Sequence, residues 1–189
     1  YSALTLVGGL IAGHDADVTD GLAAGLEASR GMLPEWRSRI EDSAWFAADA
    51  PTYFLARGGS RSSAYEARLM WEEAAKAPAT ALGTGSFRHG PQEVVTEALR
   101  VGLWLNPATL RDEDTALIRD LRSLGVKVLL MGEDVDEVAA DLVARVPKMP
   151  DGWQFLADIM PAQLAAERLA RLRGVDCDAF LYCPYIIES

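Results

Sequence analysis

Hydrophobic and polar positions change their pattern near Pro51. Before it, apolar residues recur at helical spacing, which predicts three helices, over residues 1–13, over 18–30, and from Pro34 to about residue 48. After it, short apolar runs alternate with longer amphipathic segments. That alternation is typical of a parallel sheet whose strands are joined by crossover helices.

Five apolar runs predict the strands, at residues 53–56, 79–82, 101–105, 126–131 and, more weakly, 142–146. Helices are expected over 64–77, 110–124 and 153–173, with Pro161 dividing the last and Gly174 ending it. The expected fold is α/β, a three-layer αβα sandwich around a parallel, doubly wound sheet of about five strands. Residues 51–189 would form this domain, and residues 1–50 would be N-terminal helices that pack on it or link it to an upstream subdomain.

The segment that follows the first predicted strand is rich in glycine and hydroxyl groups. Glycines permit a tight turn and a close backbone approach, and open α/β sheets place ligands where such a loop opens a helix. The serines either touch a ligand or cap the helix, and the arginines either bind an anion or pair with acids. The candidate substrate-binding residues are Arg57, Gly58, Gly59, Ser60, Arg61, Ser62 and Ser63.

Composition narrows the class of protein. The 189 residues suffice for one domain, and a formal charge of -10 argues against nucleic acid as a partner. Two histidines and two cysteines, Cys177 and Cys183, give no convincing set of metal ligands, and a reduced, cytoplasmic setting is the simplest interpretation. The apolar start is too short to cross a bilayer, so no membrane association is expected. Because the chain enters directly on a helix at Tyr1, we expect further sequence upstream.

The order of several motifs resembles the sugar isomerase (SIS) domain family. The glycine–serine loop is followed by a helix that carries Glu66 and Glu73, and then by the tetrapeptide at residues 88–91, which contains His89. Residues 161–167 and 173–178 are similar to that family's terminal helix and its Gly-x-Asp-x-Asp exit. The resemblance runs from about residue 53 to residue 178. It is closest to the second SIS subdomain of the isomerase half of glucosamine-6-phosphate synthase and to its deglycase relatives.

The resemblance implies proton transfer next to a carbonyl, in aldose–ketose or Amadori-type chemistry on a sugar phosphate or amino-sugar phosphate. It implies Glu73, partly desolvated, as the proton shuttle at the sugar carbons, and His89 as the group that assists ring opening or proton transfer at oxygen. Family members often supply this histidine across a dimer interface, so a homodimer or higher oligomer is expected, and no cofactor. Taken alone, Glu73 is as easily a solvated helix acid and His89 a loop residue beside a helix cap.

Two departures from the family pattern affect the expected chemistry. The amino-sugar synthase carries a lysine near its C-terminus that helps to open the sugar ring, whereas no lysine follows Asp178 here and Tyr185 lies near the corresponding place. Met70 stands three positions before Glu73, where that enzyme often has lysine. A fructosamine-phosphate deglycase is therefore favoured over the full synthase mechanism. The alternatives are a non-catalytic sugar-phosphate sensor and an assembly module, and the family's phosphate-binding serine loop would belong to the upstream subdomain.

Overall fold

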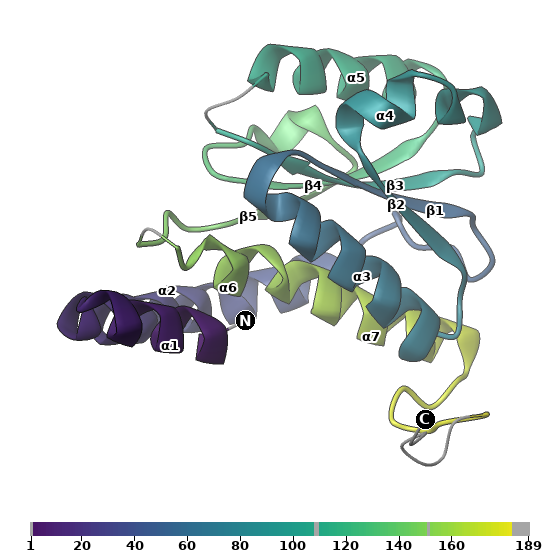
Figure 1. Ribbon diagram of the computed structural model, residues 1–189. Helices are drawn as coiled ribbons and strands as arrows, with labels where there is room; N and C mark the ends of the chain where they lie inside the picture. The colour runs from purple at the N-terminus through teal and green to yellow at the C-terminus, as the bar shows by residue number, and fades with distance from the viewer. Residues whose placement is uncertain (1, 108–109, 151, 183–189) are drawn as a thin grey trace.

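The structure, a computed structural model, describes residues 2–107, 110–150 and 152–182; Cys183 and Tyr185 lie outside these residues. Its centre is a five-stranded, all-parallel sheet in the order β2-β1-β3-β4-β5 (Figure 1). The order reverses between β1 and β3, which makes the sheet doubly wound. The strands are β1 (Thr52–Ala56), β2 (Ala79–Gly83), β3 (Arg100–Leu105), β4 (Lys127–Gly132) and β5 (Leu142–Arg145).

Helices cover both faces of this sheet, which gives the three layers that the sequence predicts (Figure 1). One face carries α2 (Asp15–Glu41), α3 (Arg61–Glu73), α6 (Gln154–Asp158) and α7 (Met160–Arg173). The other carries α4 (Thr84–Arg88) and α5 (Arg111–Ser123). The remaining helical elements are α1 (Ser2–Ala12) and three 3₁₀ turns, η1 (Gly58–Ser60), η2 (Pro91–Val94) and η3 (Glu137–Ala139).

Strand residues alternate between the two hydrophobic cores, because successive side chains of a strand point to opposite faces. Phe54, for example, belongs to the core under α3 and α7, whereas Leu55 belongs to the core under α4 and α5. Phe54 packs edge-on against Trp71 of α3, with ring centroids 4.9 Å apart. Each such aromatic pair contributes about 0.5–1.5 kcal/mol beyond its buried area.

Gly102 of β3 makes room for the Phe54 ring. A Cβ atom at Gly102 would lie 2.7 Å from Phe54 Cδ1, and the two residues are register partners on adjacent strands. Because Phe54 is fully buried, its ring has no open space to move into. The absence of a side chain at Gly102 is thus a packing requirement of the sheet.

The N-terminal helices differ from the prediction. Two helices precede the first strand, since α2 continues through Pro34 and ends at Glu41, short of the expected end. A proline within a helix lacks an N–H donor and crowds the carbonyl four residues back. Both Pro34 and Arg30 lie on the exposed side of α2, so water can satisfy that carbonyl and the helix continues.

α2 packs closely against the elements that follow β5. Cβ atoms at Gly21 and Gly25 would lie 2.6 Å from Trp153 Nε1 and 2.9 Å from Met149 Cε. Further along the helix, Trp36 donates its indole N–H to the backbone oxygen of Arg145, at 2.7 Å. The C-terminal half of α2 and the segment after it therefore share a hydrophobic core with the sheet, whereas α1 has no buried residue. The described chain contains no helix long and apolar enough to cross a membrane.

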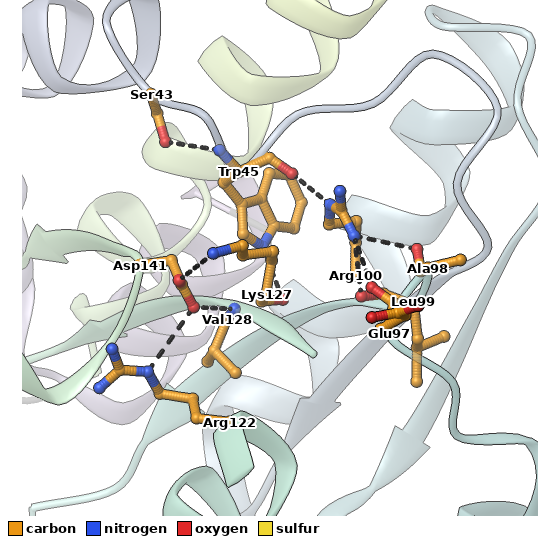
Figure 2. Close-up of polar contacts among 10 residues, drawn as sticks. All are labelled: Ser43, Trp45, Glu97, Ala98, Leu99, Arg100, Arg122, Lys127, Val128 and Asp141. Carbon is orange, nitrogen blue, oxygen red and sulfur yellow. Dashed lines mark hydrogen bonds and ion pairs between the residues drawn. The ribbon is translucent and has the colours of Figure 1, made fainter. Parts of the chain in front are cut away.

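A polar network fixes the amino-terminal edge of the sheet (Figure 2). Asp141 accepts hydrogen bonds from the Val128 N–H at 2.9 Å and from Lys127 Nζ at 3.0 Å. Trp45 donates its indole N–H to the Lys127 carbonyl, and Arg100 donates to the Trp45 carbonyl. Burial opposes ionisation of Asp141, but these hydrogen bonds outweigh it and hold its pKa below the usual range.

The other predicted elements are confirmed with small shifts at their ends. All five strands occur within two residues of the expected bounds, Pro161 separates α6 from α7, and Gly174 ends α7 in the left-handed conformation, at φ 68°. The helix predicted after the glycine–serine loop, α3, stops at Glu73, four residues early, and Lys76 then takes a positive φ of 53°.

We predict opposite effects for two glycine-to-alanine changes. Gly102→Ala should lower the free energy of unfolding by about 1–3 kcal/mol, because the new methyl group meets the immobile Phe54 ring. Gly31→Ala should raise it by about 0.5–1 kcal/mol, because no atom lies within 4 Å of its Cβ position inside α2. Urea unfolding followed by circular dichroism measures both, and equal effects of the two changes would contradict this account of the β1–β3 contact.

Candidate functional site

A large cavity lies at the carboxyl-terminal edge of the sheet, where loops that follow β1, β3, β4 and β5 meet α6. Its volume is about 640 Å³, within the range of small-molecule sites. This is also the edge at which open α/β sheets bind ligands. The residues that line this carboxyl-edge cleft are Gly59, Ser60, Ser62, Trp104, Leu105, Asn106, Pro107, Met131, Gly132, Glu133, Val146, Lys148, Met149, Pro150, Gly152, Gln154, Phe155 and Asp158.

Asp158, the last residue of α6, is a buried acid in the wall of the cleft. Its side chain accepts a hydrogen bond from Ser60 Oγ at 2.6 Å and another from Gln154 Nε2 at 2.9 Å. Its backbone oxygen accepts the Trp104 indole N–H at 2.9 Å. Burial raises the pKa of Asp158; the two side-chain hydrogen bonds counteract this in part, and Glu133 adds to the rise.

The predicted glycine–serine loop forms the floor of the cleft at the start of α3. Gly58 takes a positive φ of 55°, which lets the chain turn out of β1 into η1. Ser60 occupies the N-cap position of α3 without making a capping bond, because its hydroxyl points to Asp158. Ser62 donates its proton to the Gly59 backbone oxygen at 2.8 Å.

Of the seven predicted binding residues, Gly59, Ser60 and Ser62 line the carboxyl-edge cleft and the other four do not. Arg57 turns toward α5, where its Nε lies 2.8 Å from Asp114 Oδ1. This is the acid-pairing alternative that the sequence left open for Arg57. Arg61 is exposed on α3, and Ser63 is buried under it.

The Arg57–Asp114 pair anchors the loop to the opposite layer. Asp114 is fully buried and Arg57 mostly so. Burial raises the pKa of Asp114, and Arg57 opposes the rise. Removing the arginine would leave a buried carboxyl without this cationic partner, which is costly. In the described chain Arg57 thus makes a structural ion pair, and a contact between Arg57 and a ligand stays a prediction.

Glu73 stands at the C-terminal end of α3 and is exposed, so the chain by itself does not give it the expected partial desolvation. It borders a groove of about 580 Å³ between α3 and the C-terminal segment, lined by Glu72, Glu73, Lys76, Ala77, Pro78, Phe180, Leu181 and Tyr182. Lys76 holds the groove together, since its Nζ donates to the backbone oxygens of Glu73 and Ala179.

His89 follows α4 and is also exposed. It lines neither the carboxyl-edge cleft nor the groove beside Glu73. α3 and α4 cover opposite faces of the sheet, as Figure 1 shows. Glu73 lies beside the residues that enter β2, whereas α4 starts after the carboxyl end of β2. The chain alone therefore separates the two predicted catalytic residues by the sheet.

Sequence reasoning missed Asp158 and Asp114, the two buried acids among the residues that the structure describes. Each lies within a helix whose spacing was recognised, but nothing in a single sequence distinguishes a buried acid from a solvated one at such positions. Within the described ranges, one set of neighbouring groups has the spacing of metal ligands, Asp176, Cys177 and Asp178 in the C-terminal segment. That set is mostly exposed and gives no sign of a built metal site.

The sequence is similar to that of isomerizing glutamine–fructose-6-phosphate aminotransferases. The Mycobacterium tuberculosis enzyme is 27% identical over 172 residues, covering 87% of this chain and 27% of the enzyme. The Thermus thermophilus enzyme is 31% identical over 128 residues, covering 66% of this chain and 21% of the enzyme. The chain thus spans about a quarter of the length of these relatives. No protein-family model matches the sequence.

Solved structures show the same fold. The C-terminal domain of glucosamine-fructose-6-phosphate aminotransferase from Francisella tularensis superposes with a TM-score of 0.68 at 22% identity, covering 89% of this chain and 47% of that one. Tagatose-6-phosphate ketose/aldose isomerase from Escherichia coli gives a TM-score of 0.69 at 20% identity, covering 87% and 47%. The parallel sheet, its flanking helices and the sequence matches confirm the resemblance to the sugar isomerase (SIS) domain family that was drawn from the motifs.

Proposed function

We propose that this chain is a phosphosugar isomerase-type domain that moves a proton next to the carbonyl of a sugar phosphate or amino-sugar phosphate. The sequence match to the isomerizing aminotransferases supports this proposal most strongly. A match over 87% of 189 residues leaves only about 25 residues outside it, so it includes the segment from Arg57 to His89. That segment carries both residues to which the family resemblance gives a catalytic role.

In the proposed reaction, Glu73 takes a proton from the carbon next to the carbonyl and returns it to the neighbouring carbon. A carboxylate does this best when it is shielded from water and held against the substrate. Glu73 is exposed in the isolated chain, and His89 lies across the sheet from it. The proposal therefore requires a second surface to cover Glu73, and a second copy of the chain that contributes His89 meets this requirement.

The alternative is a sugar-phosphate sensor that binds without transforming its ligand. Residues 179–189 contain no lysine and Glu73 is exposed, and both observations favour a sensor because each removes support for catalysis. A fructosamine-phosphate deglycase is a third possibility: it is an enzyme, but it depends mainly on the glutamate and the histidine, here Glu73 and His89, and not on the lysine. We expect a cytoplasmic setting and a homodimer in all three cases.

Proton exchange distinguishes an enzyme from a sensor. In heavy water, the chain should incorporate deuterium next to the carbonyl of fructose 6-phosphate or a fructosamine 6-phosphate, observed by proton NMR even where net turnover is slow. Glu73→Gln should slow this exchange about 10²–10⁴-fold, the usual contribution of a general base. Glu113→Gln, which changes an exposed glutamate on α5, is the matched control and should exchange at the wild-type rate.

A sensor would give a different result in the same samples. Its melting temperature would rise with ligand concentration while the sugar phosphate stays free of deuterium. Such an outcome, together with no effect of Glu73→Gln on any phosphosugar tested, would contradict the enzymatic proposal.

Mixing two inactive variants tests whether the site is shared between copies. Glu73→Gln and His89→Ala should each be nearly inactive alone. If each site takes Glu73 from one copy and His89 from the other, half of the randomly reassembled dimers carry one intact site of two, so the mixture should recover about a quarter of wild-type activity. A mixture no more active than its separate components would show that one chain supplies both residues, or that neither matters.

A further inference from the structure

The serine hydroxyl groups of the carboxyl-edge cleft, on Ser60 and Ser62, donate their protons to acceptors within the protein. A serine hydroxyl has one proton to donate and two lone pairs that accept. Ser60 gives its proton to the Asp158 carboxylate at 2.6 Å, and Ser62 gives its proton to the Gly59 backbone oxygen at 2.8 Å. Toward the cleft, both serines therefore present acceptor oxygens.

Trp104 and Gln154, which also line the cleft, likewise donate hydrogen bonds to acceptors within the protein. Trp104 is among the lining residues, but it is almost fully buried and its N–H is bonded to the Asp158 backbone oxygen at 2.9 Å. Gln154 uses one amide proton on Asp158, at 2.9 Å. Both of these donors are thus directed at Asp158.

The charges in the cleft lining also disfavour an anion. Among the described lining residues the ionisable groups are Glu133, Lys148 and Asp158, two acids and one exposed base. Arg57, the arginine of the loop nearest to the strand, is paired with Asp114 and does not line the cleft. A phosphate group carries only acceptor oxygens and up to two negative charges, so it needs donors and cations. Against its two acids, the cleft lining supplies one cation, Lys148, and the side-chain amide of Asn106 as a donor.

We propose that the carboxyl-edge cleft binds the hydroxyl- or amine-bearing part of a sugar and rejects phosphate, and that Asp158 is the positioning residue that fixes this preference through Ser60. Sugar hydroxyls and ammonium groups are donors and match the acceptor oxygens of the two serines. Phe155 supplies apolar surface for a sugar ring, and a monosaccharide fits a cavity of this size. The inference rests on the proposed function in taking the ligand to be a sugar.

Asp158 influences a ligand through Ser60, because its own carboxylate is buried and already hydrogen-bonded. The residue is 3% exposed, and both of its side-chain oxygens already accept hydrogen bonds. The groups that face it are Ser60 from η1, Gln154 from α6, Trp104 from β3 and, electrostatically, Glu133 after β4. Ionised Asp158 accepts the hydroxyl proton of Ser60 and keeps it turned away from the cleft. Protonated Asp158 would itself donate to Ser60 Oγ, and the hydroxyl proton of Ser60 would then point toward a ligand.

Titrations of the ¹⁵N-labelled chain with D-glucosamine, D-glucose and inorganic phosphate test the preference. The indole N–H signal of Trp104 and the backbone signals of residues 59–62 report on the cleft. Both sugars should shift these signals in a saturable manner, with glucosamine the tighter of the two, and phosphate should not. Saturable shifts with phosphate, or none with either sugar, would overturn the proposal.

Variants of Asp158 and Ser60 test whether these two residues contribute to sugar binding. Asp158→Asn should weaken glucosamine binding about tenfold, and Ser60→Ala should weaken it about fivefold, in line with the loss of a charged and of an ordinary hydrogen-bonding group. Ser123→Ala is the matched control, because Ser123 makes the same kind of internal hydrogen bond, to the Asp120 backbone oxygen, on the far side of the sheet. Should Asp158→Asn fail to fold, Ser60→Ala decides the question, and wild-type affinity in that variant would contradict the proposal.

The pH dependence of binding is the readout that a purely structural role would not move. Burial raises the pKa of Asp158, so lowering the pH protonates it before an ordinary aspartate. Wild-type affinity for glucosamine should fall as the pH drops through that raised pKa, whereas Asp158→Asn should show no such step. Identical pH profiles for the two proteins would exclude Asp158 as the positioning residue.

These outcomes are independent of the proton-exchange assay. Deuterium incorporation that depends on Glu73, together with a cleft that prefers phosphate, would uphold the proposed function and refute this inference. Saturable sugar binding at the cleft, without exchange by any phosphosugar, would refute the enzymatic function and leave the cleft as a sugar-recognition site.

Discussion

Parallel pairing of the five strands is the constraint on which the rest of the structure depends. It sends every strand in the same direction, so the loops that follow β1, β3, β4 and β5 converge on one edge and enclose the cleft. The strand order reverses between β1 and β3, and right-handed crossovers therefore place α3 and α4 on opposite faces of the sheet. The separation of Glu73 from His89 is thus a consequence of strand order rather than of any local feature.

Within that frame, the direction of a few hydrogen bonds determines what the cleft can recognise. Serine beside a helix N-terminus suggests anion binding when only residue types are considered. In this chain the same serines are donors to internal acceptors, and the loop arginine is committed to a buried acid. The chemistry of the loop therefore depends on Asp158 and Asp114, which lie 98 residues beyond Ser60 and 57 residues beyond Arg57.

The sequence predicted the sheet well, because short apolar runs between glycine and proline breaks are a local signal. It failed at Pro34, where only the exposure of that side of α2 explains why the helix continues. It indicated the loop at Ser60 but not its partner at Asp158, because the contact forms only after β3 to β5 bring α6 back to β1. Burial of an acid is a tertiary property, and no pattern near Asp114 or Asp158 encodes it.

The two edges of the sheet respond to acid in opposite ways. At the carboxyl edge, Asp114 and Asp158 have raised pKa values, so their ionisation costs stability and the cost disappears as the pH falls toward the usual aspartate range. At the amino edge, Asp141 has a lowered pKa, so its stabilising contribution is fully present above the usual aspartate range and is lost as the pH falls below it. As far as these three carboxyls decide, mild acid raises the free energy of unfolding through the two acids beside the cleft, and stronger acid lowers it through Asp141.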